Sequence, residues 1–303
     1  MTKYAHVVAA NTKYLPYLNA FLNSLEYVKN TQDVHIISWG LSPSYLNKLS
    51  QLSYKTIIHE ISNDSKMIEI SEGDALMRYR YKLAADLKDY ESVVVFDADS
   101  IVVRNLDLWL EVAARSKTII GVALEQKRWY GEPEEHHKVN GEYPIPRTWN
   151  EKDIACSPLF FSPKDFGDVF SYSWHIFADY PPEKRALCPD MDCLGLAILK
   201  HGVQDRVIAL AEATFSGLHE TLLKPFSHVC EQHGKLFTIN GEEIFAVHGQ
   251  YNSEIWKGWQ LEGQMKCIDR ELDGSPRCKE IAKACYEQLE NYWKKMSNYK
   301  IHV

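Results

Sequence analysis

The stretch Val93-Val94-Val95-Phe96-Asp97-Ala98-Asp99-Ser100-Ile101-Val102 runs from bulky apolar residues straight into two carboxylates that are one residue apart. Four bulky apolar residues bounded by polar ones are typical of a strand buried on both faces, as found in parallel sheets covered by helices. Asp97 and Asp99 are therefore predicted to lie at the carboxyl end of such a strand. In open α/β sheets this edge is where ligands bind.

Two carboxylates directed at one ligand site repel each other unless a cation lies between them. A hard divalent ion such as Mg²⁺ or Mn²⁺ accepts carboxylate oxygens and keeps positions open for phosphate oxygens. Asp97 and Asp99 thus indicate a site for a metal ion and a diphosphate. The alternative is a turn with two solvated acids, the commoner role of an isolated Asp-x-Asp. The position straight after a core strand favours the metal site.

Strand-like apolar runs alternate with amphipathic helical segments on both sides of this stretch. Upstream, strands are expected at residues 5–10, 34–38 and 55–61, and helices at 15–27, 43–52 and 74–87. Downstream, strands are expected at 118–124, 154–162 and 244–249, and helices at 107–114, from Pro163 onward, at 190–199 and at 279–296. This alternation predicts an α/β fold with a mainly parallel, Rossmann-like central sheet, right-handed crossovers and flanking helices.

The composition narrows the class of protein. The chain has 303 residues, 45% of them apolar and 25% charged, as in an ordinary globular protein. Its net charge of −7 argues against a nucleic-acid binder, which needs a basic stripe. Its start lacks a signal-peptide profile and no stretch approaches the ~20 apolar residues of a membrane span, so we expect a cytoplasmic protein. Its seven cysteines, without a Cys-x-x-Cys pair, are expected to be reduced.

Later segments add further candidates. Residues 125–153 have many aromatics and no clear period, and a loop that long is usually functional, for example as a lid or an acceptor-binding surface. Asp190 and Asp192 begin a predicted helix, where the dipole favours negative charge; such capping accounts for one acid better than for two. His248 ends an apolar strand, and a lone histidine is more often structural than a ligand. Lys257 lies between two tryptophans.

Taken together, these motifs resemble those of the GT-A nucleotide-sugar glycosyltransferases, above all family 8, the group that contains glycogenin and bacterial lipopolysaccharide galactosyl- and glucosyltransferases. The resemblance covers roughly residues 4 to 260 and rests on the order and spacing of several short motifs. In chain order these are the turn at Val7–Leu15, Arg80, Phe96–Ser100, Asn105–Trp109, Asp190-Met191-Asp192, His248-Gly249 and Lys257-Gly258-Trp259.

The chain departs from the family pattern at four points. Met191 replaces the usual glutamine, Gly258 replaces a proline, and the spacing from His248 to Lys257 is three residues longer than usual. Cys156-Ser157-Pro158 stands where the family usually has Asn-Ala/Ser-Gly close to the sugar. These differences concern sugar recognition more than metal or nucleotide binding.

The resemblance implies a role for each matched residue. A Mn²⁺ or Mg²⁺ ion would be held by Asp97, Asp99 and His248, and the catalytic residues beside the transferred sugar would be Asp190 and Asp192. The donor would be bound by Ala9, Ala10, Asn11, Tyr14, Arg80, Asp97, Ala98, Asp99 and Lys257. The GT-A domain would cover residues 1–265, with a nucleotide-binding half at 1–124, an acceptor-binding half at 125–265 and a helical extension at 266–303.

The implied function is metal-dependent transfer of a hexose from a UDP-sugar to a hydroxyl of a glycan or other acceptor, with retention of anomeric configuration. One alternative is a sugar-1-phosphate nucleotidyltransferase, but Ala9-Ala10-Asn11-Thr12 lacks the glycine-rich, basic loop that such enzymes carry after their first strand. The other is a non-catalytic binding protein of the same fold. Such a protein would have no reason to keep Asp97, Asp99, His248 and Lys257 together.

Overall fold

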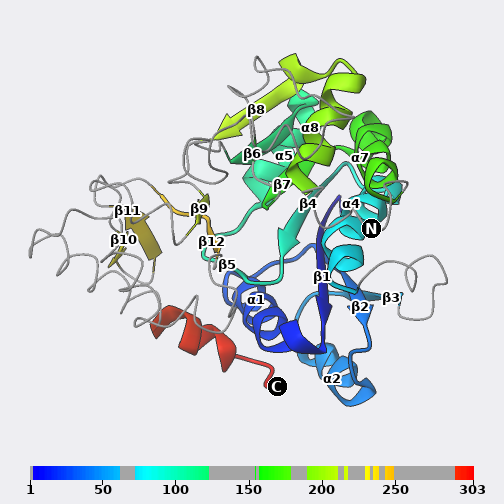
Figure 1. The fold of residues 1–303 in the computed structure, drawn as a ribbon. Coiled ribbons are helices and arrows are strands. Elements are labelled where there is room, and N and C mark those ends of the chain that lie inside the picture. Colours follow the sequence, from blue (N-terminus) through cyan, green and yellow to red (C-terminus); the bar gives the residue numbers. More distant parts are fainter. Residues whose placement is uncertain are drawn as a thin grey trace, which may run out of the picture.

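The centre of the molecule is a seven-stranded sheet in the strand order β3-β2-β1-β4-β7-β6-β8 (Figure 1). The computed structural model describes residues 3–61, 72–122, 154, 157–178, 190–210, 215–217, 229–232, 235–238, 243–248 and 291–303. The sheet contains β1 (Tyr4–Asn11), β2 (Asp33–Trp39), β3 (Thr56–Glu60), β4 (Ser92–Asp97), β6 (Ile119–Val122), β7 (Leu159–Phe161) and β8 (Val207–Leu210). The predicted α/β fold with a mainly parallel sheet is confirmed.

Four neighbouring strands bring their carboxyl ends to one edge of the sheet. β1 pairs in parallel with both β2 and β4, and β2 pairs in parallel with β3. In the β1–β4 ladder, Ala9 lies opposite Asp97, so the end of the first strand is beside the Asp-x-Asp motif. On the other side of β4, β7 runs antiparallel, with Val95 opposite Leu159. The sequence pattern did not predict this reversal.

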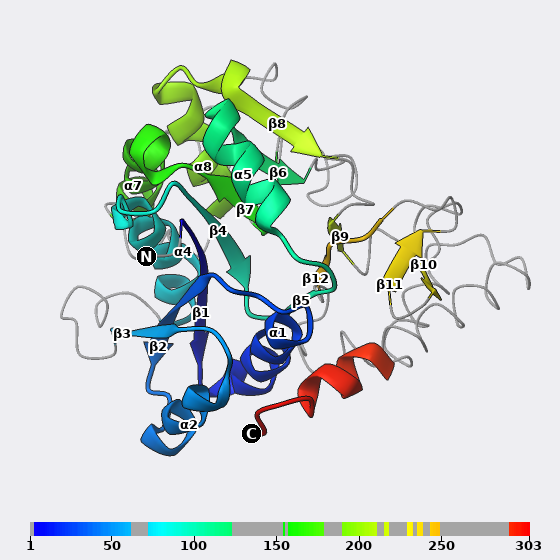
Figure 2. The same cartoon turned by 180° about the vertical axis from the view of Figure 1, so that it is seen from behind.

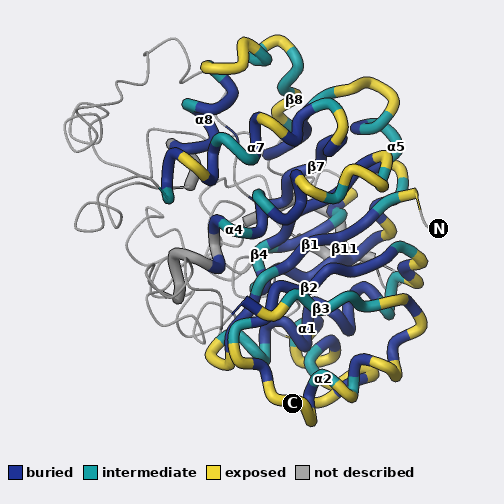
Figure 3. The backbone as a smooth tube through the Cα atoms, turned by 90° about the vertical axis from the view of Figure 1, so that its right-hand side faces the viewer, coloured by how far each residue is buried: buried dark blue, intermediate teal, exposed yellow. Residues whose placement is uncertain are grey.

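Helices cover both faces of the sheet (Figures 1 and 2). One face packs against α1 (Leu15–Tyr27) and α5 (Asp107–Ser116), and the other against α4 (Glu72–Asp86), α7 (Pro163–Ala178) and α8 (Asp190–Lys200). Along β4, Val94 and Phe96 belong to the first core, and Val93 and Val95 to the second. All four are fully buried, so the prediction of a strand buried on both faces is confirmed. The central strands of the sheet are largely dark blue, the colour of buried residues, in Figure 3.

The remaining elements are short. They are α2 (Pro43–Lys48), the 3₁₀ turns η1 (Thr12–Tyr14), η2 (Leu49–Gln51) and η6 (Gln204–Arg206), the hairpin of β10 (Val229–Gln232) and β11 (Lys235–Thr238), and a second sheet of β5 (Ser100–Val102), β9 (Phe215–Gly217) and β12 (Ala246–His248). Neither that hairpin nor β8 was predicted, because each of these strands has only four residues and periodicity is weak over so short a run. Among the described helices, none combines the length and the apolar composition that crossing a membrane requires.

The C-terminal segment is fastened to α1 by two buried asparagines. Asn23 donates from Nδ2 to the carbonyl of Ile301 at 2.8 Å, and its Oδ1 accepts the N–H groups of Ile301 and Lys300 at 2.9 and 3.1 Å. Asn19, one turn earlier on the same face of α1, donates to the carbonyls of Ser297 and Ile301. The helical residues 291–297 therefore lie along α1, as Figure 1 shows in red.

Replacing Asn23 with alanine is expected to lower the free energy of unfolding by about 3 kcal/mol, because it leaves buried main-chain groups of the C-terminal segment without partners. Asn298→Ala is the matched control, since Asn298 is exposed and, among the described residues, its side chain bonds only to a carbonyl of its own helix, that of Lys294. Its expected effect is within about 0.5 kcal/mol. Urea denaturation followed by tryptophan fluorescence measures both variants. Equal losses in the two would contradict a stabilising role of the buried contacts between the asparagines of α1 and the C-terminal segment.

Two histidines are buried in the sheet. His6 on β1 is 1% exposed, and its Nε2 lies 3.1 Å from Oδ1 of Asn30. His35 on β2 is 4% exposed and contacts Nε2 of His59 at 2.9 Å and the hydroxyl of Tyr90 at 3.1 Å. Burial lowers the pKa of His6 to about 4, and burial together with the charge of His59 lowers the pKa of His35 to about 4.

These two pKa values predict that the protein loses stability on mild acidification. The unfolded chain takes up protons on both histidines as the pH falls through about 6.5, whereas the folded chain resists until about 4. The stability they contribute is complete above pH 6.5 and decreases by about 2 kcal/mol per histidine between pH 7 and pH 5. Urea midpoints across this range measure the loss. His6→Gln should reduce the pH dependence by about half, and an unchanged slope in that variant would exclude His6 as a source.

Candidate active site

A second, three-stranded sheet brings His248 to the Asp-x-Asp motif. β12 (Ala246–His248) pairs antiparallel with β5 (Ser100–Val102), the strand that begins directly after Asp99, and in parallel with β9 (Phe215–Gly217). In this register His248 lies opposite Ser100. His248 and Asp99 are 149 residues apart in the sequence, and this strand pairing places them side by side.

The β5–β12 ladder is extended by contacts just beyond β5. The carbonyl of Phe245 accepts the N–H groups of Val103 and Arg104 at 2.8 and 3.2 Å. The guanidinium of Arg104, which is 9% exposed, donates to the carbonyl of Ile244 at 3.2 Å and forms an ion pair with Glu243 at 3.3 Å. Arg104 therefore holds the segment that leads into β12 and so fixes the approach of His248.

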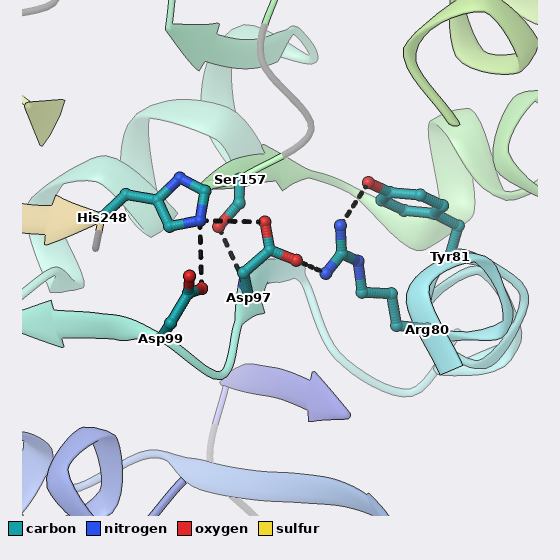
Figure 4. A network of polar contacts seen from close by, with 6 residues as sticks. All are labelled: Arg80, Tyr81, Asp97, Asp99, Ser157 and His248. Carbon is teal, nitrogen blue, oxygen red and sulfur yellow. Dashed lines mark hydrogen bonds and ion pairs between the residues drawn. The ribbon is translucent and has the colours of Figure 1, made fainter. Parts of the chain in front are cut away.

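Asp97, Asp99 and His248 converge on one point at the sheet edge (Figure 4). Nε2 of His248 lies 3.2 Å from Oδ2 of Asp97 and 3.1 Å from Oδ1 of Asp99, and the three ligand atoms lie within 4.8 Å of one another. Adjacent ligands of an octahedral Mg²⁺ or Mn²⁺ ion, each about 2.1 Å from the metal, are roughly 3 Å apart. The two distances from Nε2 and the donor set, two carboxylates and one imidazole, therefore fit such an ion.

Arg80, on α4, holds the other side of Asp97. Its guanidinium forms an ion pair with Oδ1 of Asp97 and donates to the hydroxyl of Tyr81 at 2.9 Å (Figure 4). The Arg80 side chain is 3% exposed and that of Asp97 is 20% exposed. Because Oδ1 is bound to Arg80, Oδ2 is the oxygen that faces His248 and the centre of the candidate metal site.

The surroundings favour the ionised form of Asp99. Burial raises the pKa of this carboxyl group, but the charge and hydrogen bond of His248, a backbone hydrogen bond and the charge of Arg80 outweigh burial and lower the pKa of Asp99 below its ordinary value. A metal ligand must be a deprotonated carboxylate. Asp99 is therefore already in the form that binding a cation requires.

The end of β1 borders the same site. The structure brings to this edge four residues predicted to bind the donor, Ala9, Ala10, Asn11 and Tyr14. Ala9 lies opposite Asp97 in the ladder, and the side chain of Asn11 accepts the N–H of Tyr14 at 3.0 Å, which starts η1. Burial and the nearby charge of Asp99 raise the pKa of Tyr14, so its hydroxyl keeps its proton beside the acids.

The other predicted site residues are either buried in the core or have side chains that lie outside the described residues. Ala98 is buried against the core. Asp190 and Asp192 are in the first turn of α8, as predicted, but their side chains lie outside the described residues. Lys257 and the loop at 125–153 also lie outside the described part of the chain.

The structure places one further residue, Ser157, in contact with the candidate metal site. In the sequence it was noted only as part of a departure from the family pattern. Ser157 is 4% exposed, and its hydroxyl oxygen accepts the N–H of Asp97 at 2.8 Å (Figure 4). Ser157 reaches Asp97 because β7 runs antiparallel to β4. No sequence signal gives the direction of β7, so this contact was not predictable.

No protein-family profile matches the sequence, and no curated protein matches it. Solved structures do match its fold. The apo WbbM bifunctional glycosyltransferase has a TM-score of 0.56 at 14% identity over 93% of this chain and 51% of that chain. The galactosyltransferase LgtC, in complex with donor and acceptor sugar analogues, has a TM-score of 0.55 at 14% identity over 91% of this chain and 99% of that chain.

GlyE of Streptococcus pneumoniae TIGR4, in its apo form, has a TM-score of 0.53 at 12% identity over 99% of this chain. The chain spans 65% of the GlyE chain and about half of the WbbM chain. These likenesses confirm the fold that the motifs predicted, the GT-A type of glycosyltransferases. In this chain the Asp-x-Asp motif lies at the end of β4, and the ligand atoms of Asp97, Asp99 and His248 lie within 4.8 Å of one another.

Proposed function

We propose that this protein is a metal-dependent glycosyltransferase that transfers a hexose from a UDP-sugar to a hydroxyl of a glycan or other acceptor. The observation that carries the proposal is the convergence of Asp97, Asp99 and His248 beside the end of β1. The fold is that of solved glycosyltransferases, among them a galactosyltransferase solved with donor and acceptor sugar analogues.

Asp97, Asp99 and His248 would hold Mn²⁺ or Mg²⁺, which when bound supplies positive charge to the departing diphosphate. Arg80 orients the Asp97 carboxylate so that one oxygen faces the site, and it neutralises part of the charge that two acids create there. Lys257, from the Lys-Gly-Trp motif, would add a cation on the other side of the phosphates. These groups give an acidic protein a local site for an anionic leaving group.

The end of β1 would hold the nucleoside of the donor. The proposed contacts are Ala9, Ala10, Asn11, Tyr14 and Ala98, where small residues let a planar base approach the main chain and Tyr14 supplies a protonated hydroxyl. Asp190 and Asp192 would accept hydrogen bonds from hydroxyls of the transferred sugar, since a carboxylate accepts two or more.

For the chemical step we propose retention of configuration by a front-face displacement. The acceptor oxygen forms its bond to the anomeric carbon on the side from which the diphosphate oxygen departs, and the acceptor proton passes to that diphosphate. The proposal needs no protein nucleophile, and no residue of the chain stands out as one.

The test is a set of incubations with UDP-glucose, UDP-galactose and UDP-N-acetylhexosamines, with Mn²⁺ or with excess chelator, in which UDP release is measured. Metal-dependent release with one donor supports the proposal. Pyrophosphate release from UTP and a sugar 1-phosphate would instead identify a nucleotidyltransferase. Binding of UDP with no turnover on any donor would identify a non-catalytic binding protein.

A further inference from the structure

The main chain of Asp97 is supported differently on its two sides. On one side it continues the β1–β4 ladder, in which it lies opposite Ala9. On the other side the backbone ladder to β7 ends at Val95 and Leu159. Alternate residues of a strand direct their N–H groups to the same neighbour, so the N–H of Asp97 also points toward the β7 chain.

At this position β7 is preceded by Pro158 and Ser157, and the hydroxyl oxygen of Ser157 accepts the N–H of Asp97 at 2.8 Å. A side-chain oxygen thus replaces the main-chain acceptor of a regular ladder. Ser157 is 4% exposed, so water does not readily take over this role. An unpaired buried N–H is unfavourable, and the strand end would shift to find another partner.

We propose that Ser157 is a positioning residue for the metal site, an inference that rests on the proposed function. Its hydroxyl fixes the main chain of Asp97 so that the carboxylate divides its two oxygens between Arg80 and His248. Both oxygens already have partners at fixed places, so a small displacement of the main chain weakens one of the two contacts. Groups that orient metal ligands change metal affinity by about 10- to 100-fold when they are removed.

The experiment compares three variants with the wild-type chain, without any donor. Free Mn²⁺, followed by its electron paramagnetic resonance signal, gives the Kd for the metal, and thermal unfolding in chelator gives the Tm. Ser157→Ala should raise the Mn²⁺ Kd by about 10- to 100-fold, and Ser157→Thr, which keeps the acceptor oxygen, should stay within roughly threefold of wild type. If Ser157→Ala does not fold, Ser157→Cys replaces it, because sulfur is a weak acceptor.

Ser92→Ala is the matched control. Ser92 is a fully buried serine at the opposite end of the same strand, and its hydroxyl donates to the carbonyl of Leu110 at 2.7 Å. We expect a comparable loss of Tm in Ser92→Ala and no change in Mn²⁺ Kd. An unchanged Kd in Ser157→Ala, or an equal rise in Ser92→Ala, would overturn the positioning role.

Failure of this inference is distinguishable from failure of the proposed function. If the wild-type chain does not bind Mn²⁺ at all, the metal site itself is wrong, and Ser157 has no metal to position. If wild type binds Mn²⁺ and Ser157→Ala binds it equally well, only the role of Ser157 fails.

Discussion

Replacing Asp99 with asparagine is expected to reduce metal-dependent turnover by about 10³-fold while leaving the fold intact. Asp99 supplies an anionic oxygen 3.1 Å from Nε2 of His248, and its lowered pKa keeps it ionised. The amide of asparagine has nearly the same shape but no charge, so it removes the strongest part of the metal contact. UDP release with saturating Mn²⁺ measures the effect, and circular dichroism checks the fold.

Asp86→Asn is the matched control for this substitution. Asp86 is exposed, lies at the end of α4 and pairs with Lys82 one turn earlier. The same chemical change there should leave turnover within about twofold of wild type, because exposed ion pairs contribute little. Full activity of Asp99→Asn, or of the wild-type chain in excess chelator, would remove the metal ion from the mechanism.

Replacing Arg80 with methionine is expected to lower the free energy of unfolding in chelator by about 3 kcal/mol. The guanidinium is 3% exposed and is paired with Asp97, so its loss leaves a largely buried carboxylate without its cation. Arg115→Met is the matched control, because Arg115 is 80% exposed and pairs with Glu111 on the surface of α5. Its expected loss is within about 0.5 kcal/mol. Urea denaturation in chelator measures both variants.

A double-mutant cycle isolates the pair from other effects of removing Arg80. Asp97→Asn removes the unpaired charge, so the double variant of Arg80→Met and Asp97→Asn should be more stable than the sum of the single losses by about 1–3 kcal/mol. Additive losses would show that Arg80 stabilises the fold through its packing and its contact with Tyr81 rather than through Asp97.

The sequence predicted best those elements of the fold that follow from local patterns of residues. The first four strands, the helices between them and the two acids at the end of β4 were all predicted, because apolar runs and amphipathic periods are local properties. Short elements such as β8 carry too little periodicity to be recognised. The helix α8 was expected at 190–199, but the part that its acids play in binding sugar stays a prediction.

The contact between His248 and the two acids was predicted through the family resemblance, and local pattern alone favoured a structural histidine. The structure gives the physical cause, which is the pairing of β12 with β5. The contact from Ser157 was found only in the structure, since it depends on the direction in which β7 enters the sheet. The hydrogen bonds from Asn19 and Asn23 to the C-terminal segment likewise join residues about 280 positions apart.

The order of strands and helices and the place of Asp97 and Asp99 at a strand end are encoded locally in this chain, because backbone periodicity and burial act over a few residues. The assembly of a metal-binding site depends instead on strand pairing between remote segments, and on which neighbour accepts each main-chain N–H. Asp97 shows both contributions: its own strand places it at the edge, and Arg80 of α4, Ser157 just before β7 and His248 of β12 orient it there.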